Sequence, residues 1–397
     1  MKTIGKLHRH PATRVCLAAL AVWLVAGLAA TPGAQPSVQA LLQGKWPGDL
    51  FNQAMEVAVV GNHAYVAIGA MGLAVIDVRN PTHCVRVGGL RFIGGSTGVA
   101  VSGNYAYVTE SYRGLHVIDV SNPTNCVRVG GCATNSHLTD VAVSGNYAYV
   151  VDAWTGLQVI DVSNPTNCVR VGGWYTGEAV NDVAVSGNHA YVANFRQGLQ
   201  VIDVSDPTNC VRVGGYVTNG LASGVAVSGN YAYVADGHAG LHVIDVSDPT
   251  NCVRIGGYNT SGSAQGVAVA GNYAYVADAW EGLQVIDVSD PTNCVRVGGY
   301  DTIGSAQGVA VDAGRIYLAD GTNGLVAVPS IPNVQFTVRV EAETNQPFTL
   351  EAATDLSGAG NWSPLVTTNV PAMPFDFVDF DVRIAEKPRK FYRIRQP

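Results

Sequence analysis

The chain has 397 residues, of which 47% are hydrophobic and only 13% are charged, and its formal net charge is −7. This composition excludes a disordered chain and supplies enough apolar material for a large core. A negative charge balance also makes nucleic acid and anionic membrane surfaces poor partners.

The N-terminus has the layout of a secretory signal peptide. Residues 1–14 carry four Lys and Arg residues and no acid, and an apolar run of 16 residues follows from Val15 to Ala30. The run is short for a membrane span and ends in small residues. We predict a signal peptide over residues 1–34 and export to the periplasm, the cell surface or the extracellular space, with an uncleaved anchor as the alternative. Its loss changes the net charge from −7 to −11, because four positive charges go. We expect no membrane insertion of the mature chain.

A repeat of constant length follows. The triplet Val-Ala-Val begins at residues 57, 99, 141, 183, 225, 267 and 309, so every interval is 42 residues. Within residues 225–258 the runs VAVSG, YAYVAD, LHVIDV and CVRIGGY are separated by Gly- and Pro-containing turns, and we name the four expected strands A to D. Short β-strands at this period are typical of a propeller blade. Strands B and C are almost continuously apolar, so both faces of each blade must be covered.

The recurring pattern L-x-V-I-D-V, with its surroundings, resembles the LVIVD repeat family over roughly residues 57–330. The resemblance implies a β-propeller-like fold and an exported protein of bacteria or archaea. It implies no defined activity.

The last repeat is incomplete. Strand A occurs seven times, whereas the Cys-Val-Arg strand D occurs six times, because the seventh copy stops at Pro329. A propeller must close, since an unpaired edge is a liability. The segment ALLQGKW at residues 40–46 lies at a suitable distance before the first strand A. We therefore predict an all-β protein with a seven-bladed β-propeller over residues 38–330, whose last blade takes its outer strand from the N-terminus.

An aspartate and an arginine recur together in six copies. Counting from the Pro-Thr turn between strands C and D places each aspartate opposite an arginine, as a structural cross-strand pair. The seventh copy lacks both residues, which favours a scaffold role over a catalytic one. The expected pairs are Asp77 and Arg86, Asp119 and Arg128, Asp161 and Arg170, Asp203 and Arg212, Asp245 and Arg254, and Asp287 and Arg296.

Six cysteines also recur every 42 residues, at the start of strand D. Strand D lies about 14 Å outside strand A. Equivalent cysteines of neighbouring blades should therefore lie beyond the ~7 Å Cα separation that a disulfide allows. We expect free thiols that act as small buried groups and hold the C–D turn. These residues are Cys84, Cys126, Cys168, Cys210, Cys252 and Cys294, and Cys132 lies outside the pattern.

The copies differ mainly in the B–C turns and the D–A connections. A four-stranded meander places both on one face, which we call the variable face, and the nearly constant A–B and C–D turns on the other. Loops on a rigid scaffold commonly carry function, and Trp, Tyr and Arg are enriched at binding hot spots. We predict that the variable face binds an extracellular protein or glycan, although several side chains could instead pack the loops onto neighbouring blades. The candidate residues are Arg91, Phe92, Tyr112, Arg113, His137, Asp140, Trp154, Trp174, Tyr175, Asp182, Phe195, Arg196, His238, Trp280 and Glu281.

Carboxylates collect on the same face. Glu56, Asp140 and Asp182 immediately precede strand A and are expected at the mouth of the central channel. Converging carboxylates suit a hard cation such as Ca²⁺. An acid before a Gly-containing turn more commonly accepts backbone N–H bonds, so we favour a protein without a cofactor and keep Ca²⁺ as the alternative. The acids that end strand B are Glu110, Asp152, Asp236, Asp278 and Asp320.

No metalloprotease, dithiol, lipase or phosphate-loop motif occurs in the sequence. We therefore expect a monomeric, non-enzymatic binding or scaffold propeller. A carboxylate-dependent hydrolase or lyase acting on an extracellular polymer is one alternative, because propellers assemble sites from different blades. A spacer that displays a C-terminal module is another. That module, residues 336–397, contains five alternating segments and is predicted to be a small β-sandwich-like domain with a role in attachment or sorting.

Overall fold

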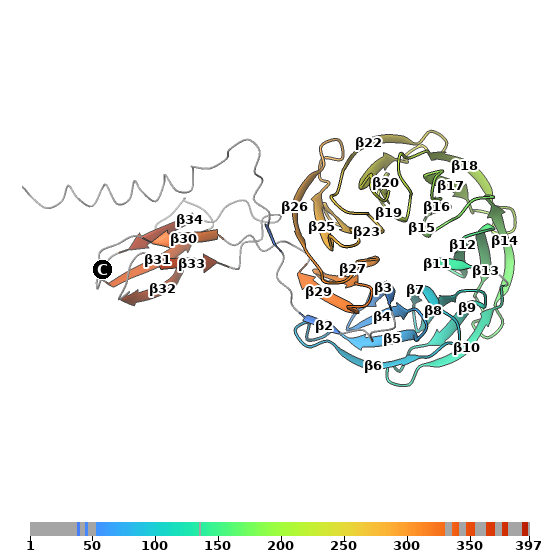
Figure 1. The fold of residues 1–397 in the computed structure, drawn as a ribbon, viewed down its shortest axis with the longest axis horizontal. Coiled ribbons are helices and arrows are strands. Elements are labelled where there is room, and N and C mark those ends of the chain that lie inside the picture. Colours follow the sequence, from blue (N-terminus) through green and yellow to red (C-terminus); the bar gives the residue numbers. More distant parts are fainter. Residues whose placement is uncertain are drawn as a thin grey trace, which may run out of the picture. The chain divides into compact units, whose positions relative to one another are not determined.

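The computed structural model describes residues 38–39, 44–46, 53–134 and 136–329, together with five strands between residues 336 and 395. The predicted signal peptide lies outside the described residues. Seven sheets stand around one axis (Figure 1). Five consist of four consecutive antiparallel strands in a meander, one adds a parallel strand from the N-terminus to such a meander, and one combines three consecutive strands with an antiparallel strand from the N-terminus. The predicted seven-bladed β-propeller is confirmed.

Each blade runs from strand A at the axis to strand D at the rim. The A strands are β3 (Ala54–Val60), β7 (Ser96–Ser102), β11 (Leu138–Ser144), β15 (Asp182–Ser186), β19 (Gly224–Ser228), β23 (Gly266–Ala270) and β27 (Gly308–Asp312). The B strands are β4 (His63–Ile68), β8 (Tyr105–Glu110), β12 (Tyr147–Asp152), β16 (His189–Ala193), β20 (Tyr231–Ala235), β24 (Tyr273–Ala277) and β28 (Arg315–Ala319). The C strands are β5 (Gly72–Asp77), β9 (Gly114–Asp119), β13 (Gly156–Asp161), β17 (Leu199–Asp203), β21 (Leu241–Asp245), β25 (Leu283–Asp287) and β29 (Leu325–Pro329). The D strands are β6 (Val85–Leu90), β10 (Val127–Cys132), β14 (Val169–Tyr175), β18 (Val211–Tyr216), β22 (Val253–Tyr258) and β26 (Val295–Tyr300).

The N-terminal segment completes the ring as predicted. Strand β2 (Gly44–Trp46) pairs antiparallel with β29 and so supplies the outer strand of blade 7. The half-buried Trp46 packs against the apolar cluster between blades 7 and 1. One further strand was not predicted, because β1 (Val38–Gln39) adds to β26 in parallel and extends blade 6 to five strands.

The core lies between the blades, which explains why strands B and C are apolar on both faces. In β4, Ala64 and Val66 pack toward Tyr317 of blade 7, whereas Tyr65 and Ala67 pack toward blade 2. Seven such clusters of buried residues lie around the ring. Full burial of one Val, Leu or Phe side chain contributes about 1.5–3 kcal/mol, so these interfaces dominate the stability of the ring.

The Gly-Gly pair that recurs in strand D has a steric reason. The first glycine of its Gly-Gly pair lies against the backbone carbonyl of the proline in the next blade's C–D turn, at a distance that a Cβ atom would not allow. Each blade therefore rests on the turn of its neighbour. The contacts join Gly88 to Pro123, Gly130 to Pro165, Gly172 to Pro207, Gly214 to Pro249 and Gly256 to Pro291.

The cysteine prediction is confirmed for the described residues. All seven described cysteines have free thiols. Each of the six repeated thiols lies 3.3–3.6 Å from the carbonyl oxygen of the proline three residues earlier, and so fastens the C–D turn. Cys84 and Cys168 are buried and the other four are partly buried. Burial raises the pKa of these thiols above the ordinary value, which makes them poor nucleophiles.

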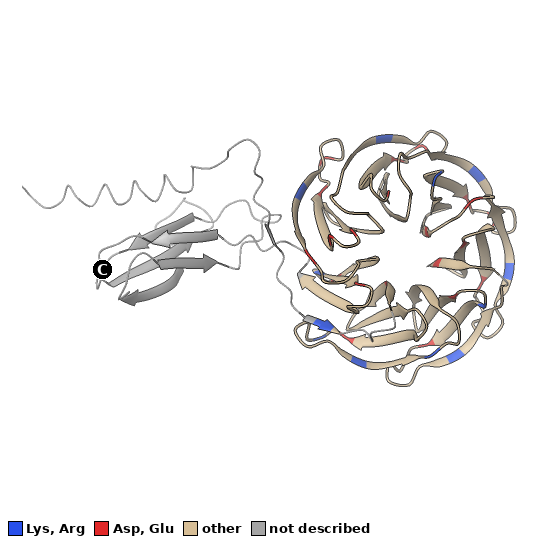
Figure 2. Ribbon diagram, in the orientation of Figure 1, with Lys and Arg blue, Asp and Glu red and all other residues tan. Residues whose placement is uncertain are grey.

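The expected Asp–Arg pairs are wrong. Asp77 lies opposite Val85 and Arg86 lies opposite Ile76, because a β-bulge interrupts the C–D register just beyond the turn. The aspartates instead accept the backbone N–H two residues later, as Asp119 does from Ser121 at 2.9 Å. The arginines lie on the outermost strands, where Figure 2 shows basic residues in blue. The same shift separates Asp119 from Arg128, Asp161 from Arg170, Asp203 from Arg212, Asp245 from Arg254 and Asp287 from Arg296.

The five strands predicted after residue 336 coincide with strands of the structure. They are β30 (Phe336–Val340), β31 (Pro347–Ala353), β32 (Ser363–Asn369), β33 (Phe375–Asp379) and β34 (Phe391–Arg395). Strands β30 and β33 form one antiparallel pair, and β32, β31 and β34 form a second sheet. The predicted sandwich packing of these sheets stays a prediction.

Candidate functional site

The two variable segments share one face of the propeller. The B–C turn of one blade forms a β-bridge with the D–A connection that follows the same blade, as between Gly237 and Ala264, whose backbone groups exchange hydrogen bonds of 3.1 and 3.0 Å. Equivalent bridges occur at Gly69, Phe195, Ala279 and Gly321. Backbone bridges therefore join the two variable segments on one face in blades 1, 4, 5, 6 and 7.

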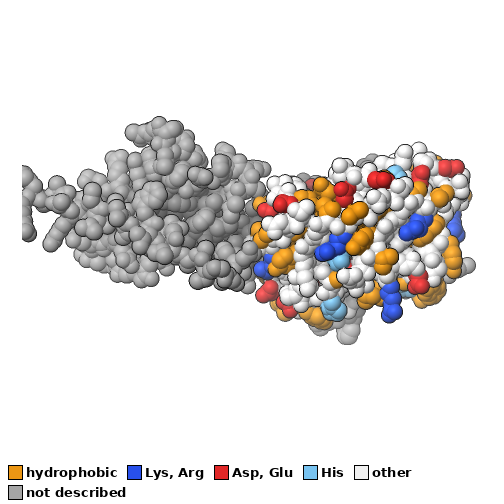
Figure 3. Space-filling model, turned by 90° about the horizontal axis from the view of Figure 1, so that it is seen from above, with side chains coloured by type: hydrophobic (Ala, Val, Ile, Leu, Met, Phe, Trp, Pro, Cys, Tyr) orange, Lys and Arg blue, Asp and Glu red, His pale blue; other side chains and the backbone are white. Residues whose placement is uncertain are grey.

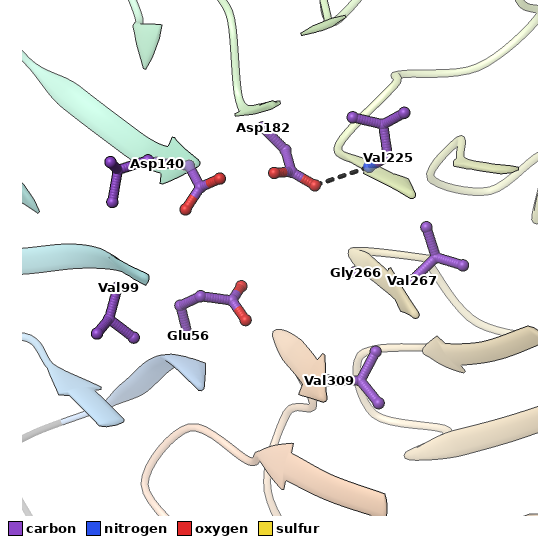
Figure 4. A pocket seen from close by; sticks show the side chains of 9 residues that line it. Glu56, Val99, Asp140, Asp182, Val225, Gly266, Val267 and Val309 are labelled. Carbon is purple, nitrogen blue, oxygen red and sulfur yellow. Dashed lines mark hydrogen bonds between the residues drawn. The ribbon is translucent and has the colours of Figure 1, made fainter. Parts of the chain in front are cut away.

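Three acidic side chains meet in the central channel, where the sequence predicted them. Glu56 extends from β3, Asp140 from β11 and Asp182 from the start of β15. They reach into a cavity of about 150 Å³ at the axis (Figure 4). The remaining lining is apolar or lacks a side chain and consists of Val99, Val141, Val225, Gly266, Val267 and Val309.

Asp182 links two blades. Its Oδ1 accepts the N–H of Val183 at 2.6 Å, and its Oδ2 accepts the N–H of Val225 in blade 5 at 2.7 Å (Figure 4). Asp140 lies beside it. Burial raises the pKa of Asp140 well above its usual range, and the charge of Asp182 and a hydrogen bond with that carboxyl raise it further. Asp140 therefore holds its proton more tightly than an exposed aspartic acid does.

Glu56 completes the group of three. Its Oε1 accepts the N–H of Val57 at 2.9 Å. Burial is the main reason that its pKa rises from 4.5 to about 8, and the charge of Asp182 adds to the rise, while the Val57 N–H opposes it. Glu56 thus has a pKa close to neutral pH and lies beside two carboxyl groups that are hydrogen-bonded to each other. Acid–base catalysis uses arrangements of this kind.

The acids that end strand B have structural partners. Asp236 accepts the Thr218 hydroxyl and, at 2.7 Å, the N–H of Gly220, both in the D–A connection that enters its own blade. Asp278 and Asp320 hold the equivalent Thr and Gly of their connections. The predicted acceptor role is correct, but the donors come from the D–A connection as well as from the turn.

Blade 3 is different. Asp152 accepts the N–H groups of Trp154 and Thr155 in its own B–C turn, at 2.8 and 3.2 Å, and the side-chain amide of Gln158. Thr134, which corresponds to the Asp-bound threonine of the later blades, has a buried hydroxyl without a partner. The repeated network is therefore rewired at this position.

The described residues contain no group of three or more His, Cys, Asp or Glu side chains arranged to hold a metal ion. Glu56 and Asp182 bind backbone N–H groups, and Asp140 binds Asp182. The Ca²⁺ alternative thus gains no support from the channel geometry.

Three aromatic side chains of the variable face meet between blades 2 and 3. Tyr112 and Trp154 come from the B–C turns of these blades, and His137 comes from the connection between them. The Tyr112 ring lies 5.3 Å from His137 and 5.6 Å from Trp154, centroid to centroid, and His137 lies 6.1 Å from Trp154. Tyr112 and Trp154 are 55% and 56% exposed. This group of three is called the aromatic platform below.

Other candidates from the sequence are placed less uniformly. Phe92 is only 7% exposed and stacks on His116 of β9, at 4.6 Å between ring centroids, so it presents no ring to a ligand. Trp174 packs against the cluster between blades 3 and 4. Phe195 is partly buried. The exposed candidates are Arg91, Arg113, Tyr175, Arg196, His238, Trp280 and Glu281.

The D–A connections also expose aliphatic side chains that are not among the predicted binding residues. Ile93, Val217 and Ile303 are among the most exposed large hydrophobic residues of the described chain. Their position in the variable connections could have identified them as binding residues. The enrichment of Trp, Tyr and Arg at hot spots instead favoured aromatic and charged residues. Seen from the side, the described surface in view mixes hydrophobic, basic and acidic side chains without a continuous patch of one charge (Figure 3).

The repeat can be assigned to a known family. The LVIVD repeat model matches residues 52–89, 93–134, 137–176, 177–218, 219–260, 261–302 and 303–339. The chain belongs to the LVIVD repeat family. The LVIVD units coincide with the seven blades, so the family resemblance of the sequence is confirmed.

Solved structures share the fold of this LVIVD repeat protein. The β-propeller domain of Cps50 (Swd1) from Myceliophteria thermophila matches with a TM-score of 0.60 and 11% identity, covering 74% of this chain and 99% of that domain. The computationally designed protein Ika8 matches with a TM-score of 0.54 and 11% identity, covering 73% and 99%. No curated protein matched the sequence. In the described part of the chain, no helix has the length and apolar character needed to cross a bilayer.

Proposed function

We propose that this protein is a non-enzymatic, exported binding or scaffold propeller that engages an extracellular protein or glycan through its variable face. The observation that carries the proposal is the asymmetry between the two faces. One face repeats the same turns in almost every blade, while the other exposes different aromatic, basic and aliphatic side chains from each blade. Exposed Trp, Tyr and Arg on a rigid scaffold are the residues that dominate binding energies.

The proposed binding surface lies over blades 2 to 4. It contains the aromatic platform, Arg113, Tyr175 and Arg196, all of which are at least partly exposed. Trp280 on blade 6 makes no ring contact with another described aromatic residue and is not part of this surface.

The test compares the two faces with matched variants. Tyr112→Ala combined with Tyr175→Ala removes exposed apolar surface from the variable face. Val211→Ala combined with Val253→Ala does so at the start of strand D, on the opposite face. Both proteins are applied to an array of defined oligosaccharides and to immobilised extracellular matrix proteins. We expect the first variant to lose the binding seen with the wild type and the second to keep it. Equal binding by both variants would reject the face assignment.

The channel carboxyls favour one alternative function. Glu56, Asp140 and Asp182 resemble the acid–base groups of a hydrolase or lyase, since the pKa values of Glu56 and Asp140 are raised. A polysaccharide incubated with the wild type would then release reducing ends, and Asp140→Asn or Asp182→Asn would abolish the release. If the wild type releases no product, the hydrolase or lyase alternative is contradicted.

If all variable-face variants keep the biological activity of the protein, the ring acts as a spacer for the C-terminal module.

A further inference from the structure

We propose that the aromatic platform of Tyr112, His137 and Trp154 is a glycan subsite on which one saccharide ring stacks. This inference rests on the proposed binding role of the variable face and names its ligand class and location. Two of the rings are more than half exposed, although each contacts the other rings of the platform. Large aromatic surfaces left in solvent on a rigid turn commonly mark a binding site.

Backbone hydrogen bonds hold the three rings in place. The N–H of Tyr112 donates to the carbonyl of Ser136 at 3.0 Å, and the N–H of Ala153 donates to the carbonyl of His137 at 2.9 Å. Tyr112 has a φ of 63°, which a tyrosine rarely adopts and which the surrounding contacts must enforce. The backbone that carries the three rings is therefore fixed before a ligand binds, so that little backbone freedom is lost on binding.

The repeat provides an internal comparison for Trp154. The sequence Asp-Ala-Trp occurs at residues 152–154 and again at residues 278–280. In blade 6, Asp278 binds Thr260 and Gly262, and Ala279 takes a φ of 50°. In blade 3, Asp152 binds the turn that carries Trp154 and leaves the hydroxyl of Thr134 unpaired.

The carboxylate of Asp152 is thus bound to the turn that carries Trp154, whereas the equivalent carboxylate of blade 6 is bound to the D–A connection. Departures of this kind from the local rule are expected at functional sites. Trp280 follows the same Asp-Ala pair in sequence but lacks both the rewired turn and the adjoining rings. The blade 3 arrangement is therefore specific to the platform.

The ring geometry selects the ligand. Centroid separations of 5.3–6.1 Å mean that the rings touch one another, so no ammonium group fits between them as in an aromatic cage. A ligand must lie on the outer faces, which suits the flat C–H face of a pyranose. Arg113, Ser136 and Thr155 are next to the platform residues in sequence and are exposed or partly exposed. Their N–H and O–H groups offer donors to hydroxyl groups, although Nε of Arg113 lies 3.7 Å from Oε1 of Glu110. A peptide that binds by strand addition would need an unpaired strand edge, and the strands that flank these turns are paired on both sides.

The experiment uses the full-length protein and a series of defined oligosaccharides that includes neutral and uronic sugars. Binding is followed by the tryptophan fluorescence change and by calorimetry for the wild type, Trp154→Ala, Trp154→Phe and Trp280→Ala. Melting temperatures of all four proteins are measured so that a folding defect is recognised. Loss of one stacking ring corresponds to a reduction in affinity of about tenfold or more.

We expect Trp154→Ala to weaken binding of an oligosaccharide by about tenfold or more, Trp154→Phe to recover part of it, and Trp280→Ala to leave it unchanged. Wild-type affinity in a folded Trp154→Ala protein would overturn the platform. Binding lost only in Trp280→Ala would also overturn it, while the proposed role of the variable face would survive in another place. If no oligosaccharide binds the wild type but a protein ligand is lost in Tyr112→Ala, the ligand class is wrong and the binding face stands.

Discussion

The carbonyl oxygen of Pro249, in the C–D turn of blade 5, lies directly against Gly214 in the outer strand of blade 4. A Cβ atom on residue 214 would overlap this oxygen and push two blades apart. We expect Gly214→Ala to lower the free energy of unfolding by about 1–3 kcal/mol, as overpacking in a rigid contact does. Thermal unfolding followed by circular dichroism measures the change.

Gly95→Ala is the matched control for this prediction. A Cβ atom on residue 95 has no neighbour within 4 Å, and the residue does not have a positive φ. Its melting temperature should equal that of the wild type or rise slightly, because alanine reduces the freedom of the unfolded chain. Equal melting temperatures for both variants would show that the glycine–proline contact tolerates a methyl group.

Glu56 makes the stability of the ring depend on pH. Its pKa is raised from 4.5 to about 8 in the folded protein, chiefly by burial. The folded state therefore binds a proton that the unfolded chain releases, and stability falls as the pH rises from about 4.5 to about 8. Glu56→Gln keeps the oxygen that accepts the Val57 N–H and removes the titration.

We expect Glu56→Gln to raise the melting temperature at pH 9 and to change it little at pH 4. One pKa unit corresponds to about 1.4 kcal/mol, so the gain at high pH is on the order of a few kcal/mol. Asp119→Asn is the control of opposite sign, because hydrogen bonds from Ser121 lower the pKa of Asp119 and stabilise the folded state once the carboxyl is ionised. A pH-independent effect of Glu56→Gln would contradict the raised pKa.

The architecture was predictable because a strict 42-residue period leaves little choice of fold. The count of seven A strands against six D strands also predicted the role of β2, since a ring cannot leave one blade short. The prediction that each aspartate lies opposite an arginine was wrong for a local reason. Leu73 lies opposite Leu90, as the count requires, but the bulge at Val87 shifts the residues between it and the turn, including Asp77 and Arg86. The sequence does not predict that bulge.

The candidate site was predictable in outline but not in its contacts. Chain order placed Tyr112, His137 and Trp154 on one face, since all three belong to variable segments. Their mutual contact could not be predicted, because it depends on the blade 3 turn, and the same Asp-Ala-Trp sequence adopts another turn in blade 6. Asp152 binds donors of its own turn, whereas Asp278 binds Thr260 and Gly262 of the D–A connection, and Ser136 stands in blade 3 where blade 6 has Gly262.

The thiols provide a test of the blade geometry. Seven cysteines remain after removal of the predicted signal peptide, and all seven are free. A thiol reagent should titrate seven groups in the unfolded mature chain. In the native protein, Cys84 and Cys168 should react slowest, because they are buried and burial raises the pKa of each thiol. Two or more groups missing from the unfolded titration would indicate a disulfide and contradict the separation of the outer strands.

Closure by the N-terminal segment is tested by two truncations. A chain that starts at residue 38 keeps β1 and β2, whereas a chain that starts at residue 50 loses both and exposes the edges of β26 and β29. The second chain also loses Trp46, which packs against the cluster between blades 7 and 1. Loss of a half-buried tryptophan and of both short N-terminal strands should remove roughly 3–5 kcal/mol of stability. We therefore expect the longer chain to melt like the mature protein and the shorter one to melt at a clearly lower temperature.

If Trp46→Ala in the longer chain reproduces most of the loss, side-chain packing rather than strand pairing holds the ring closed. Identical melting of the two truncated chains would show that blade 7 is stable with three strands.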